Sequence, residues 1–282
     1  MRRILIPTDF SENAMNAINY ALELFKYDVS EFYIMHTYQD EIYADQALLT
    51  QETFDEVTRI VSQRSEEQLG ETITQINDIS PNPKHKYHAI SSNLMLVDSA
   101  DKIVDENNID IIIMGTHGKT SDRKLTFGSH TLQVLKYVQC PVLAIPVDYK
   151  YTQPRQILFP TDYMIPYKRR ELKLLCEIAA PFRSTIDILY VSKSDKLSMR
   201  QQNNKGFING ELCKNKINFK TIYNKNITNA IYTYIKENKV DMLVMVNTRH
   251  SLLENILFQS TIDEISLHLD IPFLAMQNMR RF

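Results

Sequence analysis

The chain has 282 residues, 44% of them apolar, which is enough for one large hydrophobic core or for two of about 140 residues each. Its net charge of −2 comes from 32 basic and 34 acidic residues without a long basic run, which argues against nucleic acid or an acidic membrane as the main partner. The cysteines are too few and too scattered for a disulfide framework or a closed metal site, so we interpret Cys140, Cys176 and Cys213 as small apolar core residues.

The amino-terminal stretch MRRILIPTDF begins like a signal peptide, with two arginines, but Asp9 interrupts its apolar run after a few residues. Along the rest of the sequence, no segment approaches the roughly 18 apolar residues that a membrane span needs. We therefore expect a cytoplasmic protein without a membrane segment.

Short β-branched runs alternate with helical patterns from the start of the chain. The runs predict strands near 3–8, 31–37, 84–90, 110–115 and 141–146, and the periodicities between them predict helices near 11–27, 50–78, 94–108 and 128–138. The strands are almost continuously apolar, as strands are when both of their faces are buried. The pattern predicts an α/β fold with a parallel sheet and helices on both faces.

The chain also contains an internal repeat. The sequence "ILIPTDFS" at 4–11 returns as "ILFPTDYM" at 157–164, an offset of 153 residues. Two later pairs, "DIIIMGT" with "DMLVMVN" and "CPVLAIP" with "IPFLAMQ", have an offset of 131, so the second copy is shorter by 22 residues. We expect the additional residues of the first copy to lie in the segment at about 41–78, whose shorter counterpart is at about 195–214. We predict two domains, 1–148 and 154–282, joined by a polar connector.

Three of the six glycines of the chain lie close together after the predicted fourth strand, at Gly115, Gly118 and Gly128. Glycine lets another group approach the main chain, and a helix beginning at Ser129 would offer unpaired N–H groups and a partial positive charge. A strand, a glycine loop and a helix in this order favour a cradle for phosphate oxygens. The alternative is that the glycines only shape a turn and Ser129 only caps the helix.

This spacing, G-x-x-G, nine residues and then G-S, resembles the nucleotide-binding pattern of the universal stress proteins, as do "ILIPTDFS" and "CPVLAIP". The resemblance covers the whole chain as two tandem copies. It implies two doubly wound, flavodoxin-like or Rossmann-like domains, each with a five-stranded parallel sheet in which the first and fourth strands are neighbours. Ligands of such sheets bind at the carboxyl ends of the strands, where the strand order reverses.

The resemblance implies that the first copy binds ATP, or ADP or AMP in its place, either with or without a Mg²⁺ ion. The first strand end and Thr37 would hold the nucleoside, and the glycine loop and the following helix would hold the phosphates. Asp9 has an alternative role as a helix cap. The implied contacts are Pro7, Thr8, Asp9, Thr37, Met114, Gly115, Gly118, Lys119, Gly128, Ser129, His130 and Thr131, with Arg123 and Lys124 as further loop cations.

The second copy keeps the Pro-Thr-Asp sequence at 160–162 but loses the glycines. Asn247 is assigned to the place of Gly115, His250 lies near that of Gly118, and Gln259 replaces Gly128. We expect Ser260 to remain a helix cap and no nucleotide site of the family type to form in this half.

The leading hypothesis is a cytoplasmic stress-response regulatory module that binds an adenine nucleotide and contacts unidentified protein partners. A weak ATPase or phosphoryl-transferring enzyme, in which His117 and Asp9 assist hydrolysis, and a ligand-independent interaction protein are the alternatives. The tandem copies predict an intramolecular pseudo-dimer, with a homodimer also open. We assign no catalytic residue and no metal ligand, since His85 and His88 would lie on opposite faces of a strand.

Overall fold

The structure is a computed structural model that describes residues 1–43, 51–117, 127–192, 196–212, 215–247 and 269–277. The chain divides into two compact units, Met1–Tyr151 and Thr152–Phe282. Each unit is described by itself.

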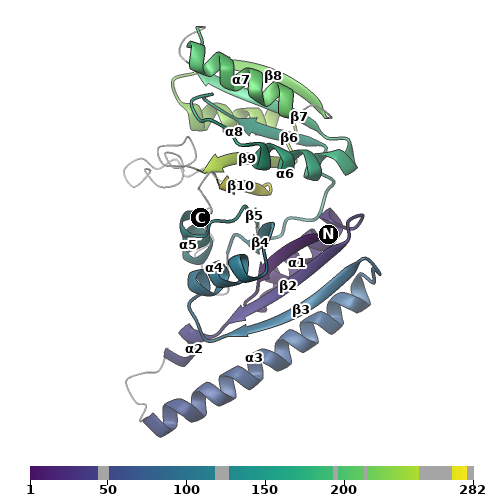
Figure 1. Ribbon diagram of the computed structural model, residues 1–282, viewed down its shortest axis with the longest axis vertical. Coiled ribbons are helices and arrows are strands. Elements are labelled where there is room, and N and C mark those ends of the chain that lie inside the picture. Colours follow the sequence, from purple (N-terminus) through teal and green to yellow (C-terminus); the bar gives the residue numbers. More distant parts are fainter. Residues whose placement is uncertain (44–50, 118–126, 193–195, 213–214, 248–268, 278–282) are drawn as a thin grey trace. The chain divides into compact units, whose positions relative to one another are not determined.

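The first unit alternates strands and helices along its whole length (Figure 1). Its strands are β1 (Arg2–Pro7), β2 (Ser30–Thr37), β3 (His85–Ser92), β4 (Ile111–Gly115) and β5 (Val142–Ile145). Its helices are α1 (Glu12–Leu24), α2 (Gln39–Tyr43), α3 (Gln51–Ile79), α4 (Leu96–Glu106) and α5 (Ser129–Tyr137). The five predicted strands and four predicted helices of this unit are confirmed to within a few residues, and the short helix α2 was not predicted.

The five strands of this unit form a parallel sheet in the order β3-β2-β1-β4-β5. The first strand thus pairs with β2 on one side and with β4 on the other, as the family resemblance implies. The central strands are buried on both faces, and Ile111, Ile112 and Ile113 have no exposed surface. Helices α4 and α5 pack together, whereas α1 contacts β4 and β5 and α3 contacts β2 and β3. Because parallel crossovers are right-handed, this strand order places the two pairs of helices on opposite faces.

The second unit repeats this topology. Its strands β6 (Gln156–Pro160), β7 (Thr185–Ser192), β8 (Lys216–Tyr223), β9 (Met242–Asn247) and β10 (Phe273–Gln277) are parallel in the order β8-β7-β6-β9-β10. Its described helices are α6 (Arg169–Ala179), the 3₁₀ turn η2 (Ala180–Phe182), α7 (Met199–Glu211) and α8 (Ile227–Glu237). Helix α7 has 13 residues where α3 has 29, which confirms that the extra length of the first copy lies in this segment.

The two units also share unusual backbone conformations. Phe10 and Tyr163, one residue after each Thr-Asp pair, have φ of 60° and 58°, and Asn108 and Lys239, before β4 and β9, both have φ of 48°. Non-glycine residues rarely occupy this left-handed region, so their recurrence at matching positions reflects the repeat and not chance.

Two of the three cysteines lie within the described residues. Cys140 is fully buried and Cys176 is half-buried, and neither forms a disulfide. Cys213 lies outside the described residues. In the described part of the chain, no helix has both the length and the apolar character needed to cross a membrane.

Candidate functional site

A cavity of about 330 Å³ lies at the carboxyl ends of β1, β2 and β4 in the first unit. This is the point where the strand order reverses, which is where ligands of open parallel sheets bind. Its size is at the lower end of the range for small-molecule pockets. It is lined by Pro7, Thr8, Asp9, Ala14, Met35, His36, Thr37, Asp40, Glu41, Leu96, Met114, Gly115, His117, Ser129, His130 and Thr131.

Most of the residues predicted from the sequence come together here. Nine of the twelve line the cavity: Pro7, Thr8, Asp9, Thr37, Met114, Gly115, Ser129, His130 and Thr131. Gly128 is the residue at the start of α5 and is not part of the lining. Gly118 and Lys119 lie outside the described residues, as do Arg123 and Lys124.

The turn after β1 is held by its own side chains. The Thr8 Oγ1 accepts a hydrogen bond of 3.0 Å from the amide of Phe10, and Asp9 Oδ1 accepts one of 3.1 Å from the amide of Ser11. Ser11 is the N-cap of α1, and its hydroxyl accepts from the amide of Ala14. Asp9 therefore does not cap the helix, and its carboxylate lies in the wall of the cavity.

The base of the glycine loop is closed by hydrogen bonds between its two ends. The Gly128 amide donates to the carbonyl of Thr116 over 2.8 Å. The buried hydroxyl of Thr131 lies 3.0 Å from the Gly115 carbonyl and 3.1 Å from that of Thr116. The amide of Gly128 is thus already used within the protein, and any role of this residue in ligand binding must come from its missing side chain.

Helix α5 offers backbone donors to the cavity. Its first intrahelical bond runs from the Leu132 amide to the Gly128 carbonyl, and the N-cap residue, Gly128, has no side chain with which to cap the helix. The amides of Ser129, His130 and Thr131 have no acceptor among the described residues, and all three residues line the cavity. Amides without an acceptor among the described residues, together with the positive end of the helix dipole, are the features that favour a bound anion.

Gly115, at the end of β4, is a site of close approach. A side-chain Cβ built on this residue would lie 2.4 Å from Asn13 Nδ2 and 2.9 Å from Asn13 Cγ. Its φ is not in the left-handed region. The glycine is therefore required by space and not by backbone conformation, and the group that occupies this space is a side chain of α1.

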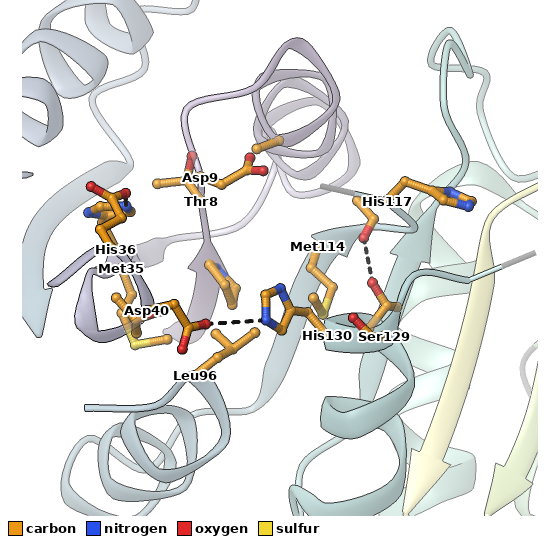
Figure 2. Close-up of a pocket in the computed structure, with 16 residues that line it drawn as sticks. Thr8, Asp9, Met35, His36, Asp40, Leu96, Met114, His117, Ser129 and His130 are labelled. Carbon is orange, nitrogen blue, oxygen red and sulfur yellow. Dashed lines mark hydrogen bonds and ion pairs between the residues drawn. The ribbon is translucent and has the colours of Figure 1, made fainter. Parts of the chain in front are cut away.

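The side of the cavity next to β2 carries groups that the sequence analysis missed. His36 is buried, with Nδ1 2.9 Å from the Ser65 hydroxyl and Nε2 3.4 Å from Glu41 Oε1. His130 and Asp40 approach one another from α5 and α2, with His130 Nε2 and Asp40 Oδ2 3.6 Å apart (Figure 2). Asp40 and Glu41 belong to the short helix α2, which has too few residues for a recognisable period.

The remaining wall is apolar. Met35 and Met114 are buried at the ends of β2 and β4, and Ala14 and Leu96 face the cavity from α1 and α4. Met35, Ala14 and Leu96 were assigned no role from the sequence. His36 and Met35 immediately precede the predicted contact Thr37, so the carboxyl end of a buried strand was the signal that could have identified them.

His117 lines the cavity, but its ring has another partner. Its Nδ1 lies 3.0 Å from the Thr116 hydroxyl. Figure 2 shows the imidazole directed away from Asp40 and His130. This geometry gives no support to a role for His117 in hydrolysis.

One assignment in the second unit was wrong by one residue. In the ladder between β4 and β5, Gly115 is paired with Ile145, and in the ladder between β9 and β10 the corresponding residue is Val246, paired with Met276. Val246, and not Asn247, therefore takes the place of Gly115. The offset of 131 between the two copies gives the same correspondence.

The strand ends of the second unit are filled by protein side chains. The buried Tyr167 forms a hydrogen bond with the Thr161 hydroxyl, and the counterpart of this threonine is the cavity residue Thr8. Buried Asn247 donates to Gln277 Oε1 over 3.0 Å. His250, Gln259 and Ser260 lie outside the described residues.

Metal ligands were not predicted, and the described residues contain no group of three or more His, Cys, Asp and Glu side chains suited to a metal ion. His85 and His88 lie on β3 as expected, the first buried and the second exposed. His85 contacts the Phe25 carbonyl and Asn82, and His88 stacks on Tyr33.

The fold and the cavity define a doubly wound α/β protein with a cavity at its strand-order reversal. The model of the universal stress protein family matches residues 1–146, which is more than half of the chain. The chain belongs to the universal stress protein family.

Known proteins agree with this membership. The chain is 26% identical over 159 residues to universal stress protein MJ0577 of Methanocaldococcus jannaschii, covering 51% of this chain and 94% of the relative. It is 23% identical over 144 residues to universal stress protein MJ0531 of the same organism, covering 51% and 81%. A universal stress protein structure from Archaeoglobus fulgidus superimposes with a TM-score of 0.69 over 98% of both chains at 17% identity, which shows a shared fold.

Proposed function

We propose that the first unit binds an adenine nucleotide, with ATP as the main ligand and ADP or AMP as alternatives, and that the chain acts as a nucleotide-responsive regulatory module in the cytoplasm. The observation that carries this proposal is a set of three amides, those of Ser129, His130 and Thr131, which have no acceptor among the described residues and belong to residues that line the cavity at the strand-order reversal. The glycine pattern and the family membership support it.

In this proposal the phosphates bind at the start of α5. The three amides would donate to phosphate oxygens, because a helix start favours negative charge. Gly118 and Lys119 would complete this part of the site. Gly128 would contribute only the absence of a Cβ, since its amide is already donated to Thr116.

The nucleoside would lie toward the ends of β1 and β2. The apolar wall made by Met35, Leu96 and Met114 would contact the flat base, and Asp9 and Thr37 would accept or donate hydrogen bonds at its rim. The residues of the β1 end, Pro7 and Thr8, would shape this half of the cavity.

The charge of the cavity bears on which nucleotide binds. Asp9, Asp40 and Glu41 line it, and among the described lining residues there is no lysine or arginine. A triphosphate would therefore need its charge offset by the loop cations or by Mg²⁺. Phosphate oxygens would supply most of the ligands of such an ion, because the described residues offer no three-ligand metal site of their own.

The second unit has no equivalent place in this proposal. Val246 carries the side chain that Gly115 lacks, and Tyr167 lies against Thr161, the counterpart of a cavity residue. We propose that this unit serves in packing or partner binding and that the chain binds one nucleotide.

The test has two parts. Mass spectrometry of the small molecules that copurify with the protein should identify an adenine nucleotide. Thermal unfolding with ATP, ADP, AMP, adenosine and, as a control, GTP should then rank the ligands, because a ligand at about 100 times its Kd stabilises the folded state by about 2.7 kcal/mol. Unchanged unfolding with every nucleotide would refute the proposal and favour the ligand-independent interaction protein. Release of inorganic phosphate from ATP in proportion to protein would favour the enzyme.

A further inference from the structure

One side chain outside the cavity lining contacts the glycine loop directly. Asn13 lies in the first turn of α1, and its Nδ2 donates a hydrogen bond of 2.6 Å to the carbonyl of His117. His117 is the last described residue before the loop that carries Gly118 and Lys119. Asn13 therefore ties α1 to the point where the chain leaves β4 for the loop.

The same side chain explains Gly115. Any Cβ at position 115 would lie 2.4 Å from Asn13 Nδ2, a distance at which one of the two groups must move. Since the backbone of Gly115 is not left-handed, an alanine here would have no conformational penalty other than this contact. Asn13 and Gly115 thus fit together as a pair.

The second unit supplies an internal comparison. There Val246 replaces the glycine, and α6 begins only at Arg169, well after β6 ends at Pro160. In the first unit, by contrast, α1 begins at Glu12 shortly after β1 ends at Pro7. The second unit therefore has no first helical turn to place a side chain like that of Asn13 against the strand end. The asparagine and the glycine are present together in one unit and absent together in the other.

The bond to His117 is made at some cost. The other amide atom of this side chain, Asn13 Oδ1, is buried and has no hydrogen-bond partner among the described residues. A buried carbonyl oxygen without a donor is unfavourable for stability. This arrangement favours a role for Asn13 in setting the position of the loop over a role in stability alone.

We propose that Asn13 is a positioning residue of the nucleotide site, which fixes the chain just after β4, at His117, relative to α1, and that Gly115 is a glycine because Asn13 fills its side-chain space. This inference rests on the proposed nucleotide function. The bonds from Gly128 and Thr131 fix the start of α5 to Thr116, and the bond from Asn13 fixes the adjacent residue His117.

The experiment measures the affinity for ATP and for adenosine by titration calorimetry, and the stability by urea unfolding, in N13D, G115A, N13A and the double variant N13A/G115A. N13D keeps the shape of the side chain but loses the donor. The matched control is N16D, because Asn16 lies on the same helix and donates to a backbone carbonyl, that of Tyr149, over 3.0 Å, but does not line the cavity.

Two results are expected. N13A and N13D should both weaken ATP binding about tenfold, the equivalent of 1.4 kcal/mol, and weaken adenosine binding much less, because the amides at the start of α5 would hold phosphates and not the nucleoside. N13A carries no charge, so its effect is not electrostatic repulsion. N16D should leave the ratio of the two affinities unchanged. G115A should weaken ATP binding and lower stability in the natural background but add little to N13A, since residues in contact show non-additive effects. A small effect of G115A should remain in the N13A background, because the Asn13 main-chain carbonyl lies 3.3 Å from the new Cβ.

Equal losses for ATP and adenosine in N13A, or a selective loss for ATP in N13D that N13A does not share, would overturn the positioning role. Additive effects of N13A and G115A on stability would overturn the pairing of the two residues. Failure of the unaltered protein to bind either ligand would refute the proposed function and, with it, the positioning role, while the stability measurements would still decide the pairing.

Discussion

The hydroxyl of Thr131 joins the start of α5 to the end of β4, and its removal is the sharpest test of how this part of the site is held. Thr131 is 2% exposed, and its Oγ1 lies 3.0 Å from the Gly115 carbonyl and 3.1 Å from the Thr116 carbonyl. Valine has nearly the same shape but no donor. A hydroxyl has one hydrogen, so T131V loses the equivalent of one hydrogen bond shared between two acceptors.

The expected cost follows from what each carbonyl retains. Thr116 still accepts from the Gly128 amide, so it does not become an unpaired buried group. T131V should therefore lower the free energy of unfolding by about 1–2 kcal/mol. This is more than the mean net contribution of a neutral hydrogen bond, because the site is buried. The affinity for ATP should also fall several-fold, since the unpaired amides of α5 would no longer be fixed relative to the loop.

Urea unfolding followed by circular dichroism measures this change. Because the chain has two units, two transitions are fitted, and the one that ATP shifts is assigned to the first unit. The control is T74V, because the Thr74 hydroxyl donates to the Gly70 carbonyl over 2.9 Å on an exposed face of α3, where the loss should stay within about 0.5 kcal/mol. A T131V protein as stable as the unaltered chain would refute the assigned role of this hydroxyl.

Three further predictions concern side-chain carboxylates or a hydrogen bond to one. D40N should increase the affinity for ATP several-fold, and more at low salt, because it removes a negative charge 3.6 Å from His130; an unchanged affinity in calorimetric titrations at two salt concentrations would count against phosphates at this end. Burial raises the pKa of Glu171 from 4.5 to about 7, so the stability that its protonated form contributes is lost as pH rises between these values. E171Q should accordingly match the natural protein at acidic pH and exceed it above pH 7 by on the order of 2–3 kcal/mol, and equal stabilities across the range would contradict this. Y234F should cost about 1.5–3 kcal/mol, because the Tyr234 hydroxyl donates over 2.7 Å to buried Asp187, and an unchanged urea midpoint would exclude that contribution.

The strands and helices could be predicted from local sequence patterns, because the strands of a doubly wound sheet are continuous apolar runs. Ile111, Ile112 and Ile113 have no exposed surface, and a run of this kind between two helical periods predicts a buried parallel strand. The strand order came from the family resemblance, since periodicity says nothing about which strands are neighbours. Helix α2 was missed because five residues are too few to show a helical period.

Part of the cavity lining could also be predicted from local sequence. Residues at the ends of β1 and β4 follow recognisable motifs, so Asp9 and Gly115 could be assigned from the sequence. Asp40 and His130 meet only through the tertiary structure, since they are ninety positions apart in the sequence. The contact between Asn13 and Gly115 also joins distant segments, and it changes the physical reason for a glycine that the motif had identified correctly.

A crystal structure of the protein grown with ATP tests the central claim most directly. The account predicts one nucleotide per chain, in the first unit, with phosphate oxygens within hydrogen-bond distance of the amides of Ser129, His130 and Thr131. A nucleotide bound only in the second unit, or one whose phosphates lie away from the start of α5, would contradict it.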